Sequence, residues 1–402
     1  MELKSLDEKT LLERSKKHIF STGIGDAASR LCRENTAYGL AKIHLVQEEY
    51  GFEPSATFIS TPDETVTRNV ERWQNGIGYG GKISWGGGSD KIIFLDVKPN
   101  CCGTLVGGLN ELPEPMSIIN SLYKLESKDF IIDGIPVKWD FNVGNHFIDI
   151  FKTSPGASVD LPEYIFIIHS SAPELKSETP LGMGLYYSQS PSLSGIMKTV
   201  KTRFGEAKIL LDSDAKAYYD FYKISERFSE QKRLLAAKEI FGDFKLISSK
   251  THQGLLNFNE SILGCHYLND TGGVLYPITL RPDLPAYLIE AKKSFSKNML
   301  EALGFFNRAE ELGVLNRLLA FNCVPHGSGY SFPDMVAVKD VINIRGVRYF
   351  VMELQNELGL KIFNNPGELQ FIYRGRQVVI SSVELELIEL KAKLIPEYVL
   401  KL

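Results

Sequence analysis

The distribution of apolar residues constrains the fold of this chain more than any other feature of its sequence. Two short apolar runs bounded by turn residues, Ile92–Val97 and Tyr164–His169, have the length and composition of buried strands. Helical periodicity marks residues 213–241 and 286–321, and two glycines interrupt the second stretch. Because strands and helices do not alternate regularly, the sequence predicts an α+β fold.

The rest of the chain can be divided in the same way. Residues 1–55 have a helical pattern, whereas residues 348–354 and 370–380 have the composition of strands. Seven glycines in residues 76–89 predict a loop, and their order matches neither a P-loop nor a dinucleotide-binding turn. The length of 402 residues allows two or three domains, but no repeat or Pro/Ser-rich linker divides the chain. We therefore expect one large domain over residues 1–402, with residues 1–55 as its helical N-terminal part.

Charge and hydropathy exclude several classes of function. The formal net charge is −4, whereas proteins that coat nucleic acid by charge alone are usually strongly basic. A nucleic-acid site must then be a local patch or act on a single end. No apolar run approaches the roughly 18–20 residues that span a bilayer, and the N-terminus lacks the apolar core of a secretory signal. We expect a cytoplasmic protein with no membrane partner, whose five cysteines stay reduced.

Histidine and cysteine are the residues that suggest a chemistry. Two of the seven histidines, His18 and His44, lie in the helical N-terminal part, where a structural role is the simpler interpretation. The other five are His146, His169, His252, His266 and His326. Their spacing matches no compact zinc motif, and an isolated histidine is more often a hydrogen-bonded structural residue than a ligand. Imidazole groups and the thiolate of Cys101 or Cys102 can nevertheless build a site for a soft or borderline metal.

Five short motifs follow one another along the chain. They are Asp96–Gly103, Gly144–Asp149, His169-Ser170, His252-Gln253 and His326–Tyr330. In this order they resemble the cysteine-glycine metal motif, the Gly-Asn-His-Phe motif, two histidine ligands and the His-Gly-x-Gly nucleophile motif of the RtcB family of GTP- and manganese-dependent RNA ligases. The Gly-Asn-His-Phe motif is the most specific of the five. The resemblance implies an RtcB-like α+β domain with mixed sheets around a dinuclear metal cleft.

The resemblance also implies a site for two Mn²⁺ ions. The ligand would be Cys102 and not Cys101, because the ligand cysteine of the family immediately precedes a glycine. Both ions would share Cys102, since a thiolate can bridge two metals. One ion would also take His169 and His252, and the other would take His146 and Asp96. The identity of the metal comes from the resemblance alone, since imidazole and thiolate bind zinc more tightly than manganese.

His326 would be the catalytic nucleophile of such an enzyme. Its ring nitrogen would attack the α-phosphate of GTP and form a covalent GMP intermediate, which divides one difficult step into two. The residues expected to contact the guanylate are Asn145, Asp149, Gly327, Ser328 and Gly329. GMP would pass to an RNA 3′-phosphate, formed from a 2′,3′-cyclic phosphate, and a 5′-hydroxyl end would then displace it. The expected partners are therefore RNA ends, either broken RNA or tRNA halves, in RNA repair or tRNA splicing.

The chain departs from the family pattern in ways that leave other functions open. The arginine that follows His-Gly-x-Gly is Tyr330 here, and the acid of the Gly-Asn-His-Phe motif is the shorter Asp149. The lysine-glycine ending of the family is missing. The family has an aspartate three residues before its metal cysteine, whereas Pro99 stands three residues before Cys102 and the nearest acid is Asp96. The alternatives are a metal-dependent phosphoesterase without nucleotidyl transfer and a non-catalytic RNA-end-binding relative.

Overall fold

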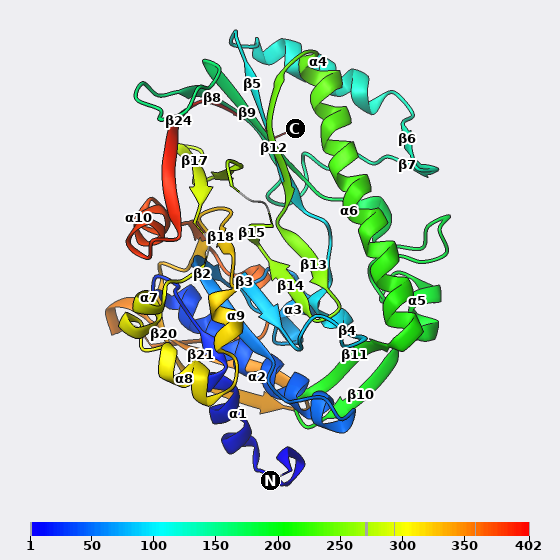
Figure 1. Cartoon of the computed structure of the whole chain (residues 1–402), viewed down its shortest axis with the longest axis vertical. Helices are drawn as coiled ribbons and strands as arrows, with labels where there is room; N and C mark the ends of the chain where they lie inside the picture. Colours follow the sequence, from blue (N-terminus) through cyan, green and yellow to red (C-terminus); the bar gives the residue numbers. More distant parts are fainter. Residues whose placement is uncertain (1, 270–271, 293, 358, 402) are drawn as a thin grey trace.

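The computed structural model describes residues 2–269, 272–292, 294–357 and 359–401 (Figure 1). It is a mixed α and β fold with several sheets, as the sequence predicts. The largest sheet is antiparallel and has seven strands in the order β12-β5-β9-β8-β24-β17-β16. Their bounds are β12 Lys245–Thr251, β5 Gly103–Leu109, β9 Tyr164–Ser170, β8 Phe147–Thr153, β24 Ile388–Leu400, β17 Ala286–Ala291 and β16 Leu275–Ile278.

A second sheet has five strands in the order β1-β2-β3-β14-β13, and only its β1-β2 pair is parallel. These strands are β1 Ile19–Phe20, β2 Thr57–Thr65, β3 Tyr79–Ser84, β14 Glu260–Leu263 and β13 Gln253–Asn257. Smaller sheets are formed by β10-β11-β4, β20-β21-β22, β15-β18, β19-β23 and β6-β7. Their bounds are β10 Lys198–Thr202, β11 Gly205–Leu211, β4 Ile92–Phe94, β20 Met335–Ile344, β21 Val347–Leu354, β22 Leu360–Phe363, β15 Cys265–Tyr267, β18 Cys323–Pro325, β19 Tyr330–Ser331, β23 Ile372–Tyr373, β6 Ile131–Ile132 and β7 Ile135–Pro136.

One long helix packs against both large sheets. Figure 1 shows α6 along one side of the molecule, and it contacts β5, β9 and β12 of the first sheet and β13 of the second. Acidic residues in its first turn suit the positive end of the helix dipole, and Gly242, with φ of 69°, ends it. The helices are α1 Glu8–Lys17, α2 Ala27–Glu49, α3 Val70–Gln74, α4 Pro115–Glu126, α5 Pro191–Ile196, α6 Asp212–Phe241, α7 Lys297–Ala302, α8 Phe306–Glu311, α9 Leu315–Leu319 and α10 Gln377–Glu384.

The seven-stranded sheet is buried on both faces, which explains the continuous apolar run in β9. Successive side chains of a strand point to opposite faces. Phe166 and Ile168 pack with residues of α4 and α6 on one face, whereas Ile165 and Ile167 join a separate cluster on the other. Burial on both faces fixes the register of β5, β9 and β8, because a slip of one residue would exchange the two sets of side chains. The ends of these strands carry the candidate site.

Several predictions of secondary structure are confirmed. The helix over residues 213–241 is α6, and the strands over residues 164–169 and 348–354 are β9 and β21. The two glycine interruptions in the stretch 286–321 are confirmed as well. Helices α7 and α8 end just before Gly304 and Gly313, which both have positive φ.

Other predictions were wrong because pairing with distant strands outweighed the local pattern. The first residues of the stretch 286–321 form strand β17, not a helix, since they pair with β16 and β24. In residues 370–380 only Ile372–Tyr373 is a strand, and helix α10 begins at Gln377.

The glycine-rich loop was also predicted wrongly. Residues 76–89 contain strand β3, which is paired on both sides, with β2 and β14. The run Ile92–Val97 is a strand only as far as Phe94 and continues as a 3₁₀ turn. Residues 1–55 contain helices α1 and α2, with the short strand β1 between them. Among the residues that the structure describes, no helix is both long and apolar enough to cross a membrane.

Candidate metal centre and adjoining cavity

The candidate ligands lie where four adjacent strands of the seven-stranded sheet begin or end. They are Cys102 directly before β5, His146 directly before β8, His169 near the end of β9 and His252 directly after β12. The strands β12, β5, β9 and β8 are neighbours in this order, and each is antiparallel to the next. The starts of β5 and β8 therefore lie beside the ends of β12 and β9, at the same end of the sheet. The backbone N–H of His252 also donates to the carbonyl oxygen of Cys102 at 2.9 Å. The sheet register therefore assembles residues that are up to 150 positions apart.

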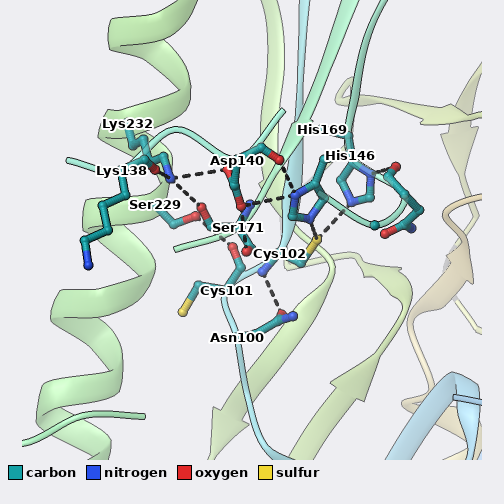
Figure 2. Close-up of polar contacts among 12 residues, drawn as sticks. Asn100, Cys101, Cys102, Lys138, Asp140, His146, His169, Ser171, Ser229 and Lys232 are labelled. Atoms are coloured by element: carbon teal, nitrogen blue, oxygen red, sulfur yellow. Dashed lines mark hydrogen bonds and ion pairs between the residues drawn. The ribbon is translucent and has the colours of Figure 1, made fainter. Parts of the chain in front are cut away.

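The four side chains converge on the sulfur of Cys102. Its Sγ lies 2.9 Å from Nε2 of His169 and 3.6 Å from Nε2 of His146 (Figure 2). Cys102, His169 and His252 are buried, and one donor atom from each lies within 4.8 Å of the other two. The ring centroid of His169 is 4.9 Å from that of His146 and 5.0 Å from that of His252. The structure thus brings Cys102, His169 and His252 together in one group that can hold a metal ion, and His146 lies against the same sulfur.

The protonation states of this group suit metal binding. Burial by itself raises the pKa of Cys102, but electrostatic interactions with the rings of His169 and His252 and the hydrogen bonds from His146 and His169 hold that pKa well below its ordinary value. Cys102 is then a thiolate, the form that binds metals. Burial lowers the pKa of His252 well below its ordinary value, which keeps this ring neutral and its lone pair available.

The ring nitrogens of His252 are buried without a hydrogen-bond partner among the described residues. Cys102 Sγ lies within 4.8 Å of one of them. A buried polar group without a partner is costly, so a buried imidazole in this state needs an explanation. A metal ion would satisfy it, and thiolate with imidazole is a suitable donor set for a borderline divalent metal.

His146 is held from behind by a buried network. Its Nδ1 lies 2.9 Å from the carbonyl oxygen of Asp140 and 3.1 Å from Oδ2 of the same residue, so Nδ1–H donates and Nε2 faces Cys102. Asp140 accepts in turn from Ser171 Oγ at 2.9 Å and lies 3.3 Å from Nζ of Lys232 on α6 (Figure 2). A carboxylate behind a histidine fixes its tautomer and orientation, as is common for metal ligands.

The same network determines the charges at this end of the group. Burial opposes ionisation of Asp140, but its contacts with His146, Lys232 and Ser171 lower its pKa to about 2. Burial would lower the pKa of His146, but its hydrogen bonds to Asp140 and Cys102 raise it to about 10. The carboxylate of Asp140 is therefore ionised, and a metal at Nε2 of His146 must displace a proton.

Two residues close in sequence to Cys102 lie outside this group. Asp96, predicted as a ligand of the second ion, is buried with its Oδ2 2.8 Å from Nζ of Lys42. The structure places Asp96 in an ion pair and not among the donors. Cys101 packs in the largest apolar core, where burial raises the pKa of its thiol well above the ordinary value, and Figure 2 shows its sulfur pointing away from the histidines. Of the two cysteines, Cys102, which precedes glycine, is the one that lies among the histidines.

His326 lies beside the metal group without belonging to it. It follows β18, and its ring centroid is 4.6 Å from that of His252. Its Nδ1 lies 2.9 Å from Oδ2 of Asp63, a fully buried residue of β2. The carboxylate of Asp63 therefore holds the Nδ1–H tautomer, and Nε2 keeps a lone pair that can attack an electrophile.

A cavity of about 150 Å³ connects His326 with the metal group. Its lining includes every residue predicted to contact a guanylate: Asn145, Asp149, Gly327, Ser328 and Gly329. Gly329 has φ of 65°, and a Cβ atom at this position would lie 2.5 Å from the carbonyl oxygen of Asp63. A larger residue would separate the loop of His326 from Asp63, so the glycine is required here.

Asp149 presents an unusual carboxyl group to this cavity. Burial alone raises its pKa to about 8, and its Oδ1 has no hydrogen-bond partner in the part of the chain that the structure describes. At neutral pH the carboxyl group is therefore mostly protonated and can donate a hydrogen bond as well as accept one. The side chain is suited to a neutral polar ligand group such as a nucleobase edge.

Three residues of the site were missed by sequence reasoning. Asp63 and Asp140 stand outside the five motifs, and the only available signal was their type, since a buried carboxylate needs a partner. Lys401 lines the cavity, and its Nζ donates to the carbonyl oxygen of Gly144. A lysine that directly follows strand β24 thus reaches the cavity. His266, predicted to be structural, hydrogen-bonds through Nε2 to the carbonyl oxygen of Pro277 at 2.9 Å.

Comparisons with known proteins do not assign the chain to a family. No protein-family model matches it, and no curated protein matches it significantly. The resemblance carried by the five motifs is therefore an expectation, and the function has to be inferred from the geometry of the site.

Proposed function

We propose that the protein is a GTP-dependent RNA ligase that joins an RNA 2′,3′-cyclic phosphate or 3′-phosphate end to a 5′-hydroxyl end. The observation that carries this proposal is the position of His326. A histidine whose Nδ1 is held by a buried carboxylate lies in one cavity with a buried cysteine-histidine group, yet it is not a member of that group. This arrangement suits a nucleophile beside a metal, because a coordinated nitrogen could not attack.

The metal would be held by Cys102, His169 and His252, with His146 as a further ligand. Two Mn²⁺ ions are part of the proposal, with Cys102 as the shared ligand. When bound, a divalent metal neutralises charge on the reacting phosphates. The residues that orient this set are Asp140 behind His146 and the carbonyl oxygen of Asn145, to which Nδ1 of His169 donates at 3.1 Å.

The first chemical step follows from the tautomer of His326. Asp63 keeps the proton on Nδ1, so Nε2 attacks the α-phosphorus of GTP, a P–N bond forms and pyrophosphate leaves. The ring becomes positively charged as the bond forms, and the carboxylate of Asp63, hydrogen-bonded to Nδ1, stabilises that charge. His326 thus holds GMP, and the guanylate is then transferred to the oxygen of an RNA 3′-phosphate. A 5′-hydroxyl oxygen attacks the activated phosphate, GMP leaves, and the strands are joined.

The cavity supplies groups for the nucleotide. Asn145 and the protonated Asp149 offer hydrogen bonds to the guanylate, and the backbone around Gly327 and Gly329 can approach phosphate closely. The cavity of about 150 Å³ adjoins a second one that shares Tyr79, Asn145, His146 and Tyr330 with it. Each cavity is smaller than the about 300–1,000 Å³ of pockets for whole ligands, so a nucleotide would have to occupy both of them.

The test is covalent labelling with GTP that carries a radioactive α-phosphate. The wild-type protein with Mn²⁺ should retain the label on a denaturing gel, and the label should be acid-labile, as a phosphoramidate is. His326→Ala should lose the label while it keeps the bound metal of the wild type, because His326 lies outside the metal group. Label that persists in His326→Ala would contradict the proposed nucleophile.

A metal-dependent phosphoesterase is the second candidate, and Tyr330 favours it. A phenol stands at the cavity where an arginine would give a bidentate contact to phosphate. Such an enzyme would open a 2′,3′-cyclic phosphate without any nucleotide and would form no adduct. The two candidates are separated by incubating the protein with a cyclic-phosphate RNA and the metal, first without any nucleotide and then after addition of GTP.

A further inference from the structure

A second cavity lies against the metal group, and its lining is basic and polar. It has a volume of about 140 Å³ and includes Cys102 and His146 in its wall. The remaining lining residues are Val66, Thr67, Arg68, Asn69, Arg72, Tyr79, Asn100, Asn145, Gln253 and Tyr330. No carboxylate occurs among these lining residues, all of which belong to the described part of the chain. The cavity thus offers cationic and amide groups next to the proposed metal.

The two arginines come from the segment that joins β2 to α3 and from α3 itself. Arg72 is buried and fixed, because its Nε donates to the carbonyl oxygen of Val97 at 3.0 Å and its Nη2 to that of Lys98. The amide of Gln253 completes this contact in the orientation in which its oxygen accepts from Nη1 of Arg72 at 2.8 Å. Arg72 is therefore a fixed positive charge in the wall of the cavity.

Arg68 is exposed and keeps donors available. Its guanidinium carbon lies 4.3 Å from the ring centroid of Phe371 and 5.8 Å from that of Tyr330, which are cation–π contacts. One nitrogen, Nη2, donates to the carbonyl oxygen of Gly367 at 3.2 Å, whereas a guanidinium carries five N–H donors. The aromatic contacts hold the guanidinium at Tyr330 and leave it able to bind an anion from the cavity.

We infer that this second cavity is a phosphate subsite, in which Arg68 provides a guanidinium contact to the phosphate group beside Cys102 and His146. The volume is well below the about 300–1,000 Å³ of pockets that enclose whole ligands, so a phosphate group is in proportion and a nucleoside is not. Arginine is the residue best suited to phosphate, because its planar fork binds two oxygens at once. Arg68 thus places a guanidinium beside Tyr330, the residue that stands where an arginine was expected.

The inference rests on the proposed function for the source of the phosphate group. That source is either the 3′-phosphate of an RNA end or the triphosphate of GTP. The two share one chemistry, and the experiment has one arm for each. Both arms use the full chain loaded with Mn²⁺, with metal content and far-UV circular dichroism measured for every variant.

The first arm compares two fluorescent RNA oligonucleotides that differ only in a 3′-phosphate or a 3′-hydroxyl end. Wild-type protein should prefer the phosphate end, and Arg68→Gln should reduce that preference about tenfold or more, because a charged hydrogen bond to phosphate is lost. Arg68→Lys should retain part of it, since the charge remains but the fork does not. Arg227→Gln is the matched control, because Arg227 is exposed on α6 and lines neither cavity.

The second arm measures the GTP concentration that half-saturates labelling of His326. A shift of about tenfold in Arg68→Gln, with the RNA preference unchanged, assigns the subsite to the triphosphate; the reverse result assigns it to the RNA end. If neither quantity differs between Arg68→Gln and Arg227→Gln, the phosphate subsite is overturned. If no labelling occurs but the RNA preference depends on Arg68, the subsite stands and the ligase proposal falls.

Discussion

At the scale of single residues, two adjacent cysteines have opposite environments. Cys101 has φ of 54°, in the left-handed region, and this turn directs its side chain into the apolar core while Cys102 faces the histidines. Gly103 follows, and a Cβ atom there would lie 2.6 Å from the carbonyl oxygen of Lys250 in the neighbouring strand β12. The short segment thus needs a residue that tolerates positive φ, a ligand and a glycine, in that order.

The first prediction concerns Cys102. Cys102→Ser should remove stoichiometric metal binding, because a serine hydroxyl is a poor ligand at neutral pH and the thiolate is the donor that the other residues share. Metal content after dialysis against limiting Mn²⁺ or Zn²⁺ measures this. Cys101→Ala is the matched control and should keep the metal, although it should lower stability because it removes a buried side chain. Equal metal loss in both variants would place the metal elsewhere.

At the scale of elements, a helix far from the chemistry supports a ligand. Lys232 of α6 is fully buried and donates to the carbonyl oxygen of Ser171 at 3.0 Å, and it lies 3.3 Å from Asp140 Oδ1 and 3.4 Å from Glu174 Oε2. A buried ammonium with carboxylate and carbonyl partners is stable only when its partners are fixed. The helix therefore fixes Asp140, and Asp140 fixes His146.

The second prediction tests this support. Asp140→Asn should weaken metal binding about 10- to 100-fold, because the amide cannot hold the His146 tautomer as the ionised carboxylate does. Titration with Co²⁺, followed by its absorption bands, measures the affinity without any enzymatic assay. Asp133→Asn is a matched control, since Asp133 is exposed and pairs with Arg227 on the surface. An unchanged Co²⁺ affinity in Asp140→Asn would show that the carboxylate of Asp140 does not support metal binding.

At the scale of the whole molecule, buried histidines make stability depend on pH. His18 is buried beside the ring of His44, at a centroid distance of 4.7 Å. Burial, together with the charges of Arg14, Arg317 and Arg308, lowers the pKa of His18 to about 3 from its ordinary value of 6.5. The folded state then binds fewer protons than the unfolded state below pH 6.5, so stability is full above that pH and falls as the pH decreases.

The third prediction follows from this sign. His18→Leu should flatten the decrease of unfolding free energy between pH 6 and pH 4 by about 1.4 kcal/mol per pH unit, because one titrating group is removed. Urea unfolding at pH 7, 6, 5 and 4 measures the slope for both proteins. The two curves should have nearly the same shape above pH 7, where His18 is neutral in both states. Parallel curves down to pH 4 would mean that His18 is protonated in the folded protein.

The sequence by itself determined the long elements whose pattern is local. Helix α6 and strand β9 follow from periodicity, and the breaks at Gly304 and Gly313 follow from the conformational freedom of glycine. It also indicated the cysteine and histidines that meet at the site, through residue types and the order of motifs. The segment that forms strand β17 was wrongly predicted as helical, because pairing with distant strands decides its conformation.

Only the tertiary structure decided which side chains lie together. The register of the seven-stranded sheet brings Cys102 to His169 and His252, and no local pattern contains that register. Likewise, Asp63 contacts His326, which is 263 positions away in the chain. Asp96 forms an ion pair with Lys42 of α2. The physical reason is the same in each case, since a buried polar group must find its partner in space, wherever in the chain that partner stands.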